Sequence, residues 1–355
     1  MTLKKNIVFS ILLYLNLSKL YAEVDWVNFG WELFDRISDA RITSLAQASI
    51  AYPITSSATS MVNPALSHIY NDKIGMTHQS RIAGMVNSEF IGFNKNMDDS
   101  SWISFSLLYE GINNIPDTRN ILLDWGNDGV FGTFDAGEGN GILDEGERLD
   151  INKIGYFNQN QLGVYAAMSK PYNKWKIGLG IKLLFQTLDD HYALGTGINI
   201  GLYRSFNGTS LGIVLHNIPS SGVIWDNGTT ELTPGSFSIG LHHLLLINKY
   251  GLKINPVCRA NFVMSERAID SKLLFNTFPV DLAGGLETIY REKIFFRVGI
   301  FQSGASTAGL GMFWDNISID YAVIADNFTL GLNDNHLITI SVSSKWIKDR
   351  ILNKI

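Results

Sequence analysis

Apolar and polar residues alternate with a period of two along most of the chain that follows residue 72. The segment 175–186 reads WKIGLGIKLLFQ, in which every odd-numbered position is apolar. The segment 294–300 reads IFFRVGI, in which every even-numbered position is apolar. Successive side chains of a β-strand point to opposite faces of a sheet, so this alternation predicts strands with one apolar and one polar face.

Fourteen segments of this kind can be recognised in the sequence. They are 72–82, 88–95, 101–111, 158–170, 173–188, 193–205, 208–217, 234–248, 250–264, 278–291, 292–302, 304–314, 315–325 and 335–346. The number is even, as in bacterial barrels, so we predict an all-β protein whose residues 72–346 form a membrane-spanning antiparallel β-barrel of about 14 strands. The alternative is a soluble two-sheet sandwich, whose strands are usually shorter and carry more charge on their outer faces.

The composition favours a membrane protein that crosses the bilayer with strands. Apolar residues make up 46% of the chain and charged residues only 17%, against about 25% in ordinary soluble domains. The net charge of −5 gives no electrostatic reason to expect nucleic acid as a partner. Cys258 is the single cysteine, so neither an internal disulfide nor a cysteine-based metal site is expected. No catalytic motif is present, and we expect that the protein is not an enzyme.

The first 22 residues have the pattern of a secretory signal peptide. Lys4 and Lys5 precede an apolar stretch at 7–17, and Ala22 is a small residue at the expected cleavage point. An uncleaved membrane anchor is the alternative, although the apolar stretch is too short to span a bilayer. Export together with a lone cysteine fits a bacterial envelope protein, so we expect the bacterial outer membrane as its location.

Residues 23–71 lack the alternation. This segment is rich in alanine, serine and threonine and contains the sequence Asn63-Pro64-Ala65. We predict short helical turns that fold inside the barrel as a hatch, because the interior of a large barrel can hold such a plug. At the other end of the chain, residues 347–355 are expected to form a periplasmic tail.

The stretch from Asp124 to Glu147 holds seven carboxylates among many glycines and no basic residue. Oxygen-bearing side chains at alternate positions, with glycine at sharp turns, follow the rhythm of calcium loops. The expected calcium ligands are Asp124, Asp128, Asp135, Glu138, Asn140, Asp144 and Glu147. A disordered acidic loop is the alternative, because Ala136 stands where a ligand is expected. The loop belongs to the connection 112–157, which we expect to be extracellular because barrels place their long loops there.

The alternation also predicts which polar side chains face the lumen of the barrel. The main candidates are Lys176, Lys182, Lys253, Arg259, Arg297 and Asp320, together with Glu110, His216, His242, Asn255 and Asn261. Because basic residues outnumber acidic ones, one hypothesis is that the lumen selects an anionic or amphipathic ligand. The alternative is that hatch acids, Glu32, Asp35 and Asp39, neutralise the basic wall, since buried charges must be paired.

Two regions of the chain carry motifs of a known family. One is LAQASIAYPITSSATSMVNPALS, which contains an Asn-Pro-Ala motif, and the other comprises GGLETIYREKIFFRVGIFQSG, TAGLGMFWDNISIDYAV and TLGLNDNHLITISV. The first region resembles the hatch of the PorV/PorQ family of outer-membrane proteins and, more distantly, of the FadL fatty-acid transporters. The second is similar to the closing strands of PorV-type proteins. The matching residues there are Gly285, Glu287, Arg297, Gly299, Gly309, Gly311, Asp320, Tyr321, Ala322, Leu330 and Gly331.

The resemblance implies an outer-membrane barrel with an amino-terminal hatch, and it implies two different roles. PorV-like proteins act in type IX secretion, whereas FadL-like proteins pass hydrophobic molecules through the barrel wall. We expect a role in protein secretion or attachment at the outer membrane, with membrane lipid and exported or cell-surface proteins as partners. The alternative is passive transport of hydrophobic small molecules such as long-chain fatty acids. Apart from calcium in the acidic loop, no cofactor is expected.

Overall fold

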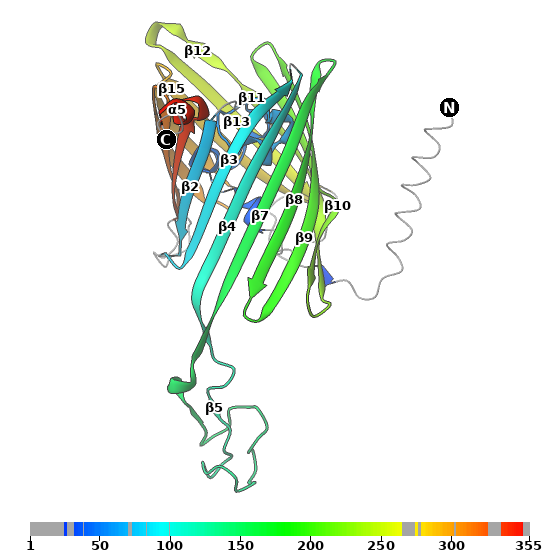
Figure 1. Cartoon of the computed structure of the whole chain (residues 1–355), viewed down its shortest axis with the longest axis vertical. Helices are drawn as coiled ribbons and strands as arrows, with labels where there is room; N and C mark the ends of the chain where they lie inside the picture. Colours follow the sequence, from blue (N-terminus) through cyan, green and yellow to red (C-terminus); the bar gives the residue numbers. More distant parts are fainter. Residues whose placement is uncertain are drawn as a thin grey trace, which may run out of the picture.

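The fold is an antiparallel β-barrel that closes on itself. The structure, a computed structural model, describes residues 25–26, 32–37, 39–69, 73–82, 84–98, 100–264, 274–275, 278–301, 303–325 and 335–350. Within these residues, 14 strands surround the lumen (Figure 1), which confirms the predicted all-β class and the strand number. The expected signal peptide at 1–22 and the end of the expected periplasmic tail lie outside the described residues.

The barrel strands follow one another in sequence order, and each pairs with the next. They are β2 (Lys73–Arg81), β3 (Val86–Asp98), β4 (Ser101–Asp117), β7 (Gly155–Tyr172), β8 (Trp175–Leu188), β9 (His191–Phe206), β10 (Thr209–Trp225), β11 (Thr230–His243), β13 (Leu252–Val263), β15 (Phe278–Tyr290), β16 (Ile294–Ile300), β17 (Ser306–Trp314), β18 (Ile317–Ala325) and β19 (Asn335–Ser343). The last strand pairs with the first, with Thr339 opposite Thr77, and this pairing closes the barrel. Each predicted segment overlaps one of these strands, and β3, β4, β7, β9, β10 and β11 extend beyond the predicted bounds.

Short elements complete the described chain. The small strands are β1 (Asp25–Trp26), β5 (Leu122–Leu123), β6 (Arg148–Leu149), β12 (Leu245–Ile247) and β14 (Leu274–Phe275). The helices are α2 (Glu32–Asp35), α3 (Ala40–Thr43), η1 (Ser49–Ala51), α4 (Thr59–Val62), η2 (Pro64–Leu66), η3 (Ile151–Lys153), η4 (Asn248–Tyr250) and α5 (Ser344–Arg350). None of the described helices is long and apolar enough to cross a membrane.

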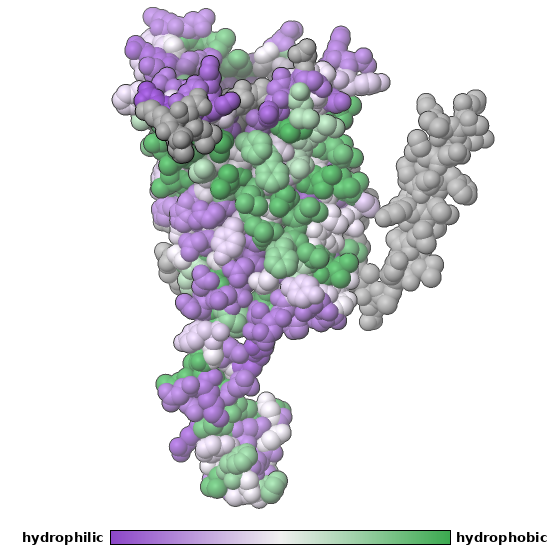
Figure 2. Space-filling model, in the orientation of Figure 1, coloured by the Kyte–Doolittle hydropathy of each residue, from purple (hydrophilic) through white to green (hydrophobic). Residues whose placement is uncertain are grey.

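The outer face of the barrel is a band of apolar side chains. On β8, Ile181 and Leu183 are exposed, whereas the alternate residues Lys182 and Leu184 are buried in the interior. The same alternation recurs from strand to strand, and it produces the apolar surface across the middle of the barrel in Figure 2. Hydrocarbon is the solvent that suits such a band, and the two-residue period of the sequence is its direct cause.

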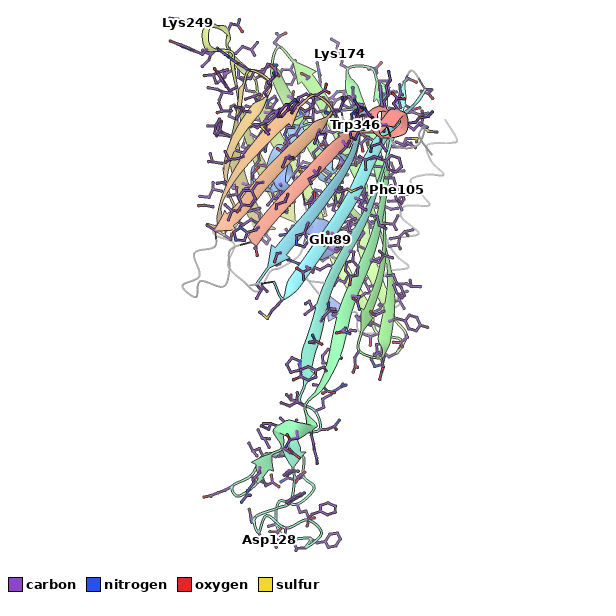
Figure 3. The ribbon with its side chains drawn as sticks, turned by 60° about the vertical axis from the view of Figure 1, so that its left-hand side comes forward. Glu89, Phe105, Asp128, Lys174, Lys249 and Trp346 are labelled. Atoms are coloured by element: carbon purple, nitrogen blue, oxygen red, sulfur yellow. The ribbon has the colours of Figure 1, made fainter. Side chains whose placement is uncertain are left out.

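The two ends of the barrel differ in the length of their connections. Lys174, Lys249 and Trp346 lie at one end, and Asp128 lies at the tip of a long projection from the other end (Figure 3). Helix α5 lies at the end with the short connections. Outer-membrane barrels have short periplasmic turns and longer extracellular loops. By this rule we expect the end that carries α5 to face the periplasm and the projection between β4 and β7 to be extracellular.

The segment 39–67 folds inside the barrel as a hatch. Its short helices α3, η1, α4 and η2 are buried throughout. Leu45 and Ile50 of the hatch pack in one apolar cluster with the inward-facing wall residues Phe90, Leu108 and Tyr165. The interior is therefore more apolar than the polar lumen that the alternation predicts, because the hatch needs a core of its own to remain folded.

Pairs of glycines in the wall allow the hatch to approach the barrel closely. Gly178 of β8 and Gly201 of β9 are cross-strand partners. A Cβ atom at Gly178 would lie 2.2 Å from the Ala65 nitrogen, and one at Gly201 would lie 2.1 Å from Asn63 Oδ1. Two further cross-strand pairs receive the hatch in the same way, Gly212 with Gly240 beneath Ile50 and Gly285 with Gly299 beneath Leu45. These glycines are required for close approach, and any side chain would displace the hatch backbone.

We expect the substitution Gly178→Ala to lower the free energy of unfolding by about 1–3 kcal/mol, because the new methyl group overlaps backbone atoms of the hatch. Thermal unfolding, followed by the loss of the compact band on a denaturing gel, measures this change. The matched control is Gly284→Ala, where the nearest atom to a new Cβ is 3.8 Å away. Equal unfolding temperatures for the two variants would show that the hatch does not depend on this contact.

Candidate functional site

The Asn63-Pro64-Ala65 motif fastens the hatch to β9. Asn63 caps the short helix η2, because its Oδ1 accepts a hydrogen bond from the Ala65 nitrogen at 3.0 Å. Its Nδ2 donates to the carbonyl oxygens of Ile50 in the hatch (2.8 Å) and Leu202 in the wall (3.2 Å). One buried amide thus joins two parts of the hatch to the barrel. The role of this motif is therefore to position the hatch.

A carboxylate on β15, Glu287, holds the hatch from the other side. Its Oε1 accepts hydrogen bonds from Nε and Nη2 of Arg41 in the hatch, both at 3.2 Å, and from Arg297 Nε on β16 at 2.7 Å. The Tyr52 hydroxyl of the hatch donates to Oε2 of the same carboxylate. Glu287 has no exposed surface, so these groups replace water as its partners.

Arg297 extends this buried cluster to β18, where its Nη1 lies 2.8 Å from Asp320 Oδ1. The Phe295 ring packs against both guanidinium groups, with its centroid 4.2 Å from Arg41 Cζ and 5.2 Å from Arg297 Cζ. Arg41, Arg297, Glu287 and Asp320 therefore form a set of two cations and two anions. Within this set no net charge is left to select an anionic ligand.

The hatch acids do not supply the partners that the sequence led us to expect for Arg297. Asp39 instead caps α3, where it accepts a hydrogen bond from the Ile42 nitrogen at 2.9 Å and another from Ser56 Oγ at 2.8 Å. The counter-ions of Arg297 come from the wall, and the hatch contributes a cation, Arg41, to the same cluster. The side chain of Glu32 lies outside the described residues.

Two predicted lumen cations lie near the periplasmic rim rather than deep in the barrel. Lys253 pairs with Glu292 at 2.5 Å, and 38% of its side chain is exposed. Lys176 is half-buried, and its ammonium group lies 5.2 Å from the centroid of the Trp102 ring. Both are placed to face the periplasm and the headgroup region, where charge costs little.

Lys182 and Arg259 lie deeper in the interior. Lys182 is buried, and its Nζ donates to Asn217 Oδ1 at 2.9 Å. Arg259 is half-buried on β13, and the hatch carboxylate of Asp35 acts electrostatically on both cations. For these two residues a hatch acid does contribute to charge balance.

The remaining lumen candidates also have polar neighbours. Glu110 pairs with Arg81, His242 bonds to Asn255 at 3.1 Å, and Asn261 accepts a hydrogen bond from Ser238 at 2.7 Å. His216 is half-buried near Lys182 and Arg259.

The hydrogen-bond ladder of the wall is interrupted in the middle of β10. Residues 216–221 of this strand oppose only residues 197–199 of β9, because the register shifts between Leu215 and Gly222. The register between β10 and β11 shifts at the same height. Pro219 has no N–H group to donate, and proline inside a strand is confined to edges and bulges. We call the segment 216–221 the β10 break.

Side chains replace the missing ladder at the β10 break. Asn217 Oδ1 accepts hydrogen bonds from Lys182 Nζ of β8 and from Ser221 Oγ at 2.8 Å. The Asn217 nitrogen donates to Asn199 Oδ1 of β9 at 3.1 Å. Gly197 makes room for this arrangement, since a Cβ there would lie 2.1 Å from Ser221 Oγ. The wall is therefore closed here by side chains, which can exchange partners more easily than a strand ladder can.

The β10 break borders the apolar part of the lumen. Val214 and Val223, which flank the break, belong to the same buried cluster as Leu33 and Phe34 of the amino-terminal segment. The Lys182 ammonium lies 5.5 Å from the centroid of the Phe34 ring. The buried polar side chains of the break, Lys182 among them, thus lie directly beside an apolar cluster inside the barrel.

A separate hollow of about 660 Å³ lies at the wall formed by β11, β13, β15 and β16. Its lining includes the outward-facing Leu241, Cys258 and Leu282, and also Arg259 and Ala283, which face the interior. Arg259 is the one charged residue of this lining.

The predicted calcium ligands gather in the extracellular projection, where they bind backbone amides. Asp124 accepts hydrogen bonds from the Gly139 and Gly141 nitrogens, both at 2.7 Å. Glu147 accepts from the Gly126 and Asp144 nitrogens, both at 2.9 Å. The Gly141 amide, followed by that of Gly139, holds the pKa of the Asp124 carboxyl below its ordinary value.

The other predicted ligands follow the same rule. Asp128 accepts from the Val130 nitrogen at 2.8 Å, and Asp135 accepts from the Asp128 nitrogen at 2.9 Å. Asn140 donates to Asp144 at 2.6 Å, and Glu138 accepts from the Gly132 and Phe134 nitrogens at 2.5 Å. In the part of the chain that the structure describes, no three acidic, histidine or cysteine side chains converge as metal ligands. To bind calcium, these carboxylates would have to exchange their hydrogen bonds to amides for coordination of the ion. Calcium binding by this loop stays a prediction.

Comparison with known proteins gives matches only among solved structures. No family model matches the sequence, and no curated protein matches it either. A mutant of TodX lacking S2 and S3, described as a monoaromatic hydrocarbon channel, has a TM-score of 0.50 and 12% identity, covering 86% of this chain and 98% of that one. The Pseudomonas putida toluene transporter TodX has a TM-score of 0.50 and 12% identity, covering 84% and 97%. Identity of this order shows a shared fold and no more.

These matches bear on the sequence-based predictions in three ways. The chain is a protein of the bacterial outer membrane, as its alternation predicts. The shared fold leaves the resemblance to the PorV/PorQ and FadL families a prediction. The similar structures are described as channels, and they give no support to a secretion role.

Several residues of the site were missed from the sequence. Arg41 and Tyr52 lie in a hatch segment without periodicity, so nothing marked them as partners of Glu287. Asn217 was taken as the end of a strand, although β10 continues to Trp225. Pro219 could have shown that the strand continues, because a proline followed by further alternation indicates a bulge rather than a strand end.

The buried ion cluster leads to a stability prediction. We expect Arg297→Ala to lower the free energy of unfolding by about 3–5 kcal/mol, because Glu287 and Asp320 would lose a buried partner. Lys253→Ala is the matched control. Loss of its partly exposed ion pair with Glu292 should lower the free energy of unfolding by less than about 1 kcal/mol. Unfolding in a urea gradient in detergent, monitored by tryptophan fluorescence, compares the two. A loss for Arg297→Ala no larger than that of the control would contradict the anchoring role.

Calcium binding can be tested on the acidic stretch from Asp124 to Glu147. We expect calcium to slow proteolytic cleavage within 124–147 several-fold relative to a chelator, because an ion would tie the carboxylates together. Limited proteolysis of the protein in detergent, followed by mass spectrometry of the fragments, measures the rate. The variant Asp124→Asn should lose most of the calcium effect. Cleavage at the same rate with calcium and with chelator would remove the calcium hypothesis.

Proposed function

We propose that this protein is a passive outer-membrane channel for hydrophobic small molecules and that they cross the wall at the β10 break. The break carries the proposal, since it is where side chains replace the β9–β10 ladder in mid-strand. Asn217 is the ninth residue of a 17-residue strand, so the break lies at the depth of the bilayer core. At that depth a lateral passage leads into hydrocarbon.

The lining of the interior supports apolar rather than charged cargo. The valines that flank the break join an apolar cluster with the hatch, and the buried arginines of the hatch and of β16 are neutralised by Glu287 and Asp320. A hydrophobic molecule that enters from outside meets the extracellular surface of this cluster. It can then leave through the wall without crossing the periplasmic end, which the hatch covers.

The similar structures support the same reading. TodX is described as a toluene transporter and as a monoaromatic hydrocarbon channel. The shared fold favours a comparable role for this chain. It does not favour the secretion role, which we preferred from the sequence resemblance. No feature of the described residues favours an exported protein as cargo.

Uptake measurements with opposite variants test the proposal. In cells that lack other hydrophobic channels, we expect the chain to raise the uptake of radiolabelled toluene several-fold over the empty vector. Asn217→Ala should raise uptake further, because Lys182 and Ser221 lose the acceptor that holds the break closed. A variant lacking residues 217–219 should reduce uptake towards the vector, because β10 then matches the length of β9 more closely.

The control is Tyr109→Phe, which removes a 2.8 Å hydrogen bond to Asn160 on the outer wall far from the break and should leave uptake unchanged. The heat-modifiable band of each variant shows that it is folded before uptake is compared. Uptake equal to that of the vector for the unmodified chain would overturn the channel. Uptake that neither variant changes would move the passage away from the β10 break.

A further inference from the structure

Large apolar side chains are exposed at the far end of the extracellular projection. Phe134 is 92% exposed and Phe131 is 76% exposed, and Val130, Ile142 and Leu143 are each more than half exposed. We call these five residues the apolar tip. Figure 3 places Asp128, two residues before Val130, at the end of the projection most distant from the barrel. Figure 2 shows apolar patches on this tip, separated from the membrane band by a polar stalk.

The apolar tip is held in place by hydrogen bonds. Glu138 accepts from the nitrogens of Gly132 and Phe134, both at 2.5 Å, and Asp128 accepts from that of Val130 at 2.8 Å. Phe134 has a φ of 54°, a left-handed conformation that is strained for a bulky residue. The loop therefore holds its aromatic rings in water, because it has no apolar interior in which to bury them.

The charge around the apolar tip has one sign. Seven carboxylates lie between Asp124 and Glu147, and no lysine or arginine lies in that stretch. Among the described residues, no salt bridge involves any of the seven. Their hydrogen bonds to amides fix the loop but leave its net charge negative. The tip is thus an apolar surface bordered by uncompensated anions.

We propose that the apolar tip is a docking surface for a protein or peptide partner that carries an apolar face bordered by lysine or arginine. Charge complementarity selects this occupant, because cations on the rim of the partner meet the carboxylates while its apolar face receives Phe131 and Phe134. A second copy of this chain would bring two acidic tips together, and an anionic lipid surface would repel the tip in the same way.

This surface is independent of transport. The strand pair β4 and β7 extends beyond the membrane band to the pair Asp117–Gly155, and β5 and β6 continue the stalk. The apolar tip therefore lies well away from the lumen and from the β10 break. A partner can bind there without contacting the passage, so the docking proposal and the channel proposal can fail separately.

A defined peptide tests the proposal on the full-length protein in phosphatidylcholine nanodiscs, in chelator so that the loop keeps its charge. The probe is a fluorescent helical peptide with one leucine face and one lysine face, and its affinity is measured by anisotropy against empty nanodiscs. We expect the F131S/F134S variant to bind at least about tenfold more weakly than the unmodified protein, as for two central aromatic anchors. Binding should also weaken at high salt.

Two controls make the result decisive. The I151S/Y156S variant removes two exposed apolar side chains at the base of the stalk, and it should bind like the unmodified protein. A peptide with glutamate in place of lysine should not bind. Equal affinity of the unmodified protein and F131S/F134S would overturn the docking surface. Binding of the glutamate peptide, or of a peptide with serine in place of leucine, as tightly as the probe would overturn the assigned partner chemistry.

Discussion

Every backbone N–H and C=O group at the depth of the bilayer core must find a partner inside the protein, because hydrocarbon offers none. The barrel meets this constraint by pairing each strand with its neighbours and by joining β19 back to β2. At the β10 break a side chain takes the place of one strand partner, since the backbone N–H of Asn217 donates to Asn199 Oδ1. The side chains of Asn217, Lys182 and Ser221 bond to one another beside it, so this part of the wall is held by side chains as well as by the ladder.

The hatch depends on the barrel in the same way. Its helices are too short to be stable alone, so their stability comes from packing against the wall. Paired glycines let the hatch backbone approach the strands, and Glu287 connects it to two strands through Arg41 and Arg297. The interior consequently carries little free charge and a large apolar cluster, a lining that suits hydrophobic cargo better than ions.

The extracellular projection is built on a separate principle. It has almost no apolar core, and its carboxylates replace a core by capping the amides of a glycine-rich chain. This use of acidic side chains explains how a loop with seven like charges can be ordered. It also explains why its large apolar residues point outwards, since the loop has no interior in which to bury them.

The sequence alone determined the architecture of the barrel. A two-residue period needs no tertiary information, because each side chain of a strand faces either lipid or lumen, and so the 14 strands and the apolar band were predictable. Only the tertiary structure decided the site. Arg41 is 246 residues from Glu287 in sequence, and Asn217 is 35 residues from Lys182, so their pairing depends on how the barrel closes and where the hatch is seated. Local patterns specify the direction in which a side chain points, whereas contacts between distant segments arise only when the chain is folded.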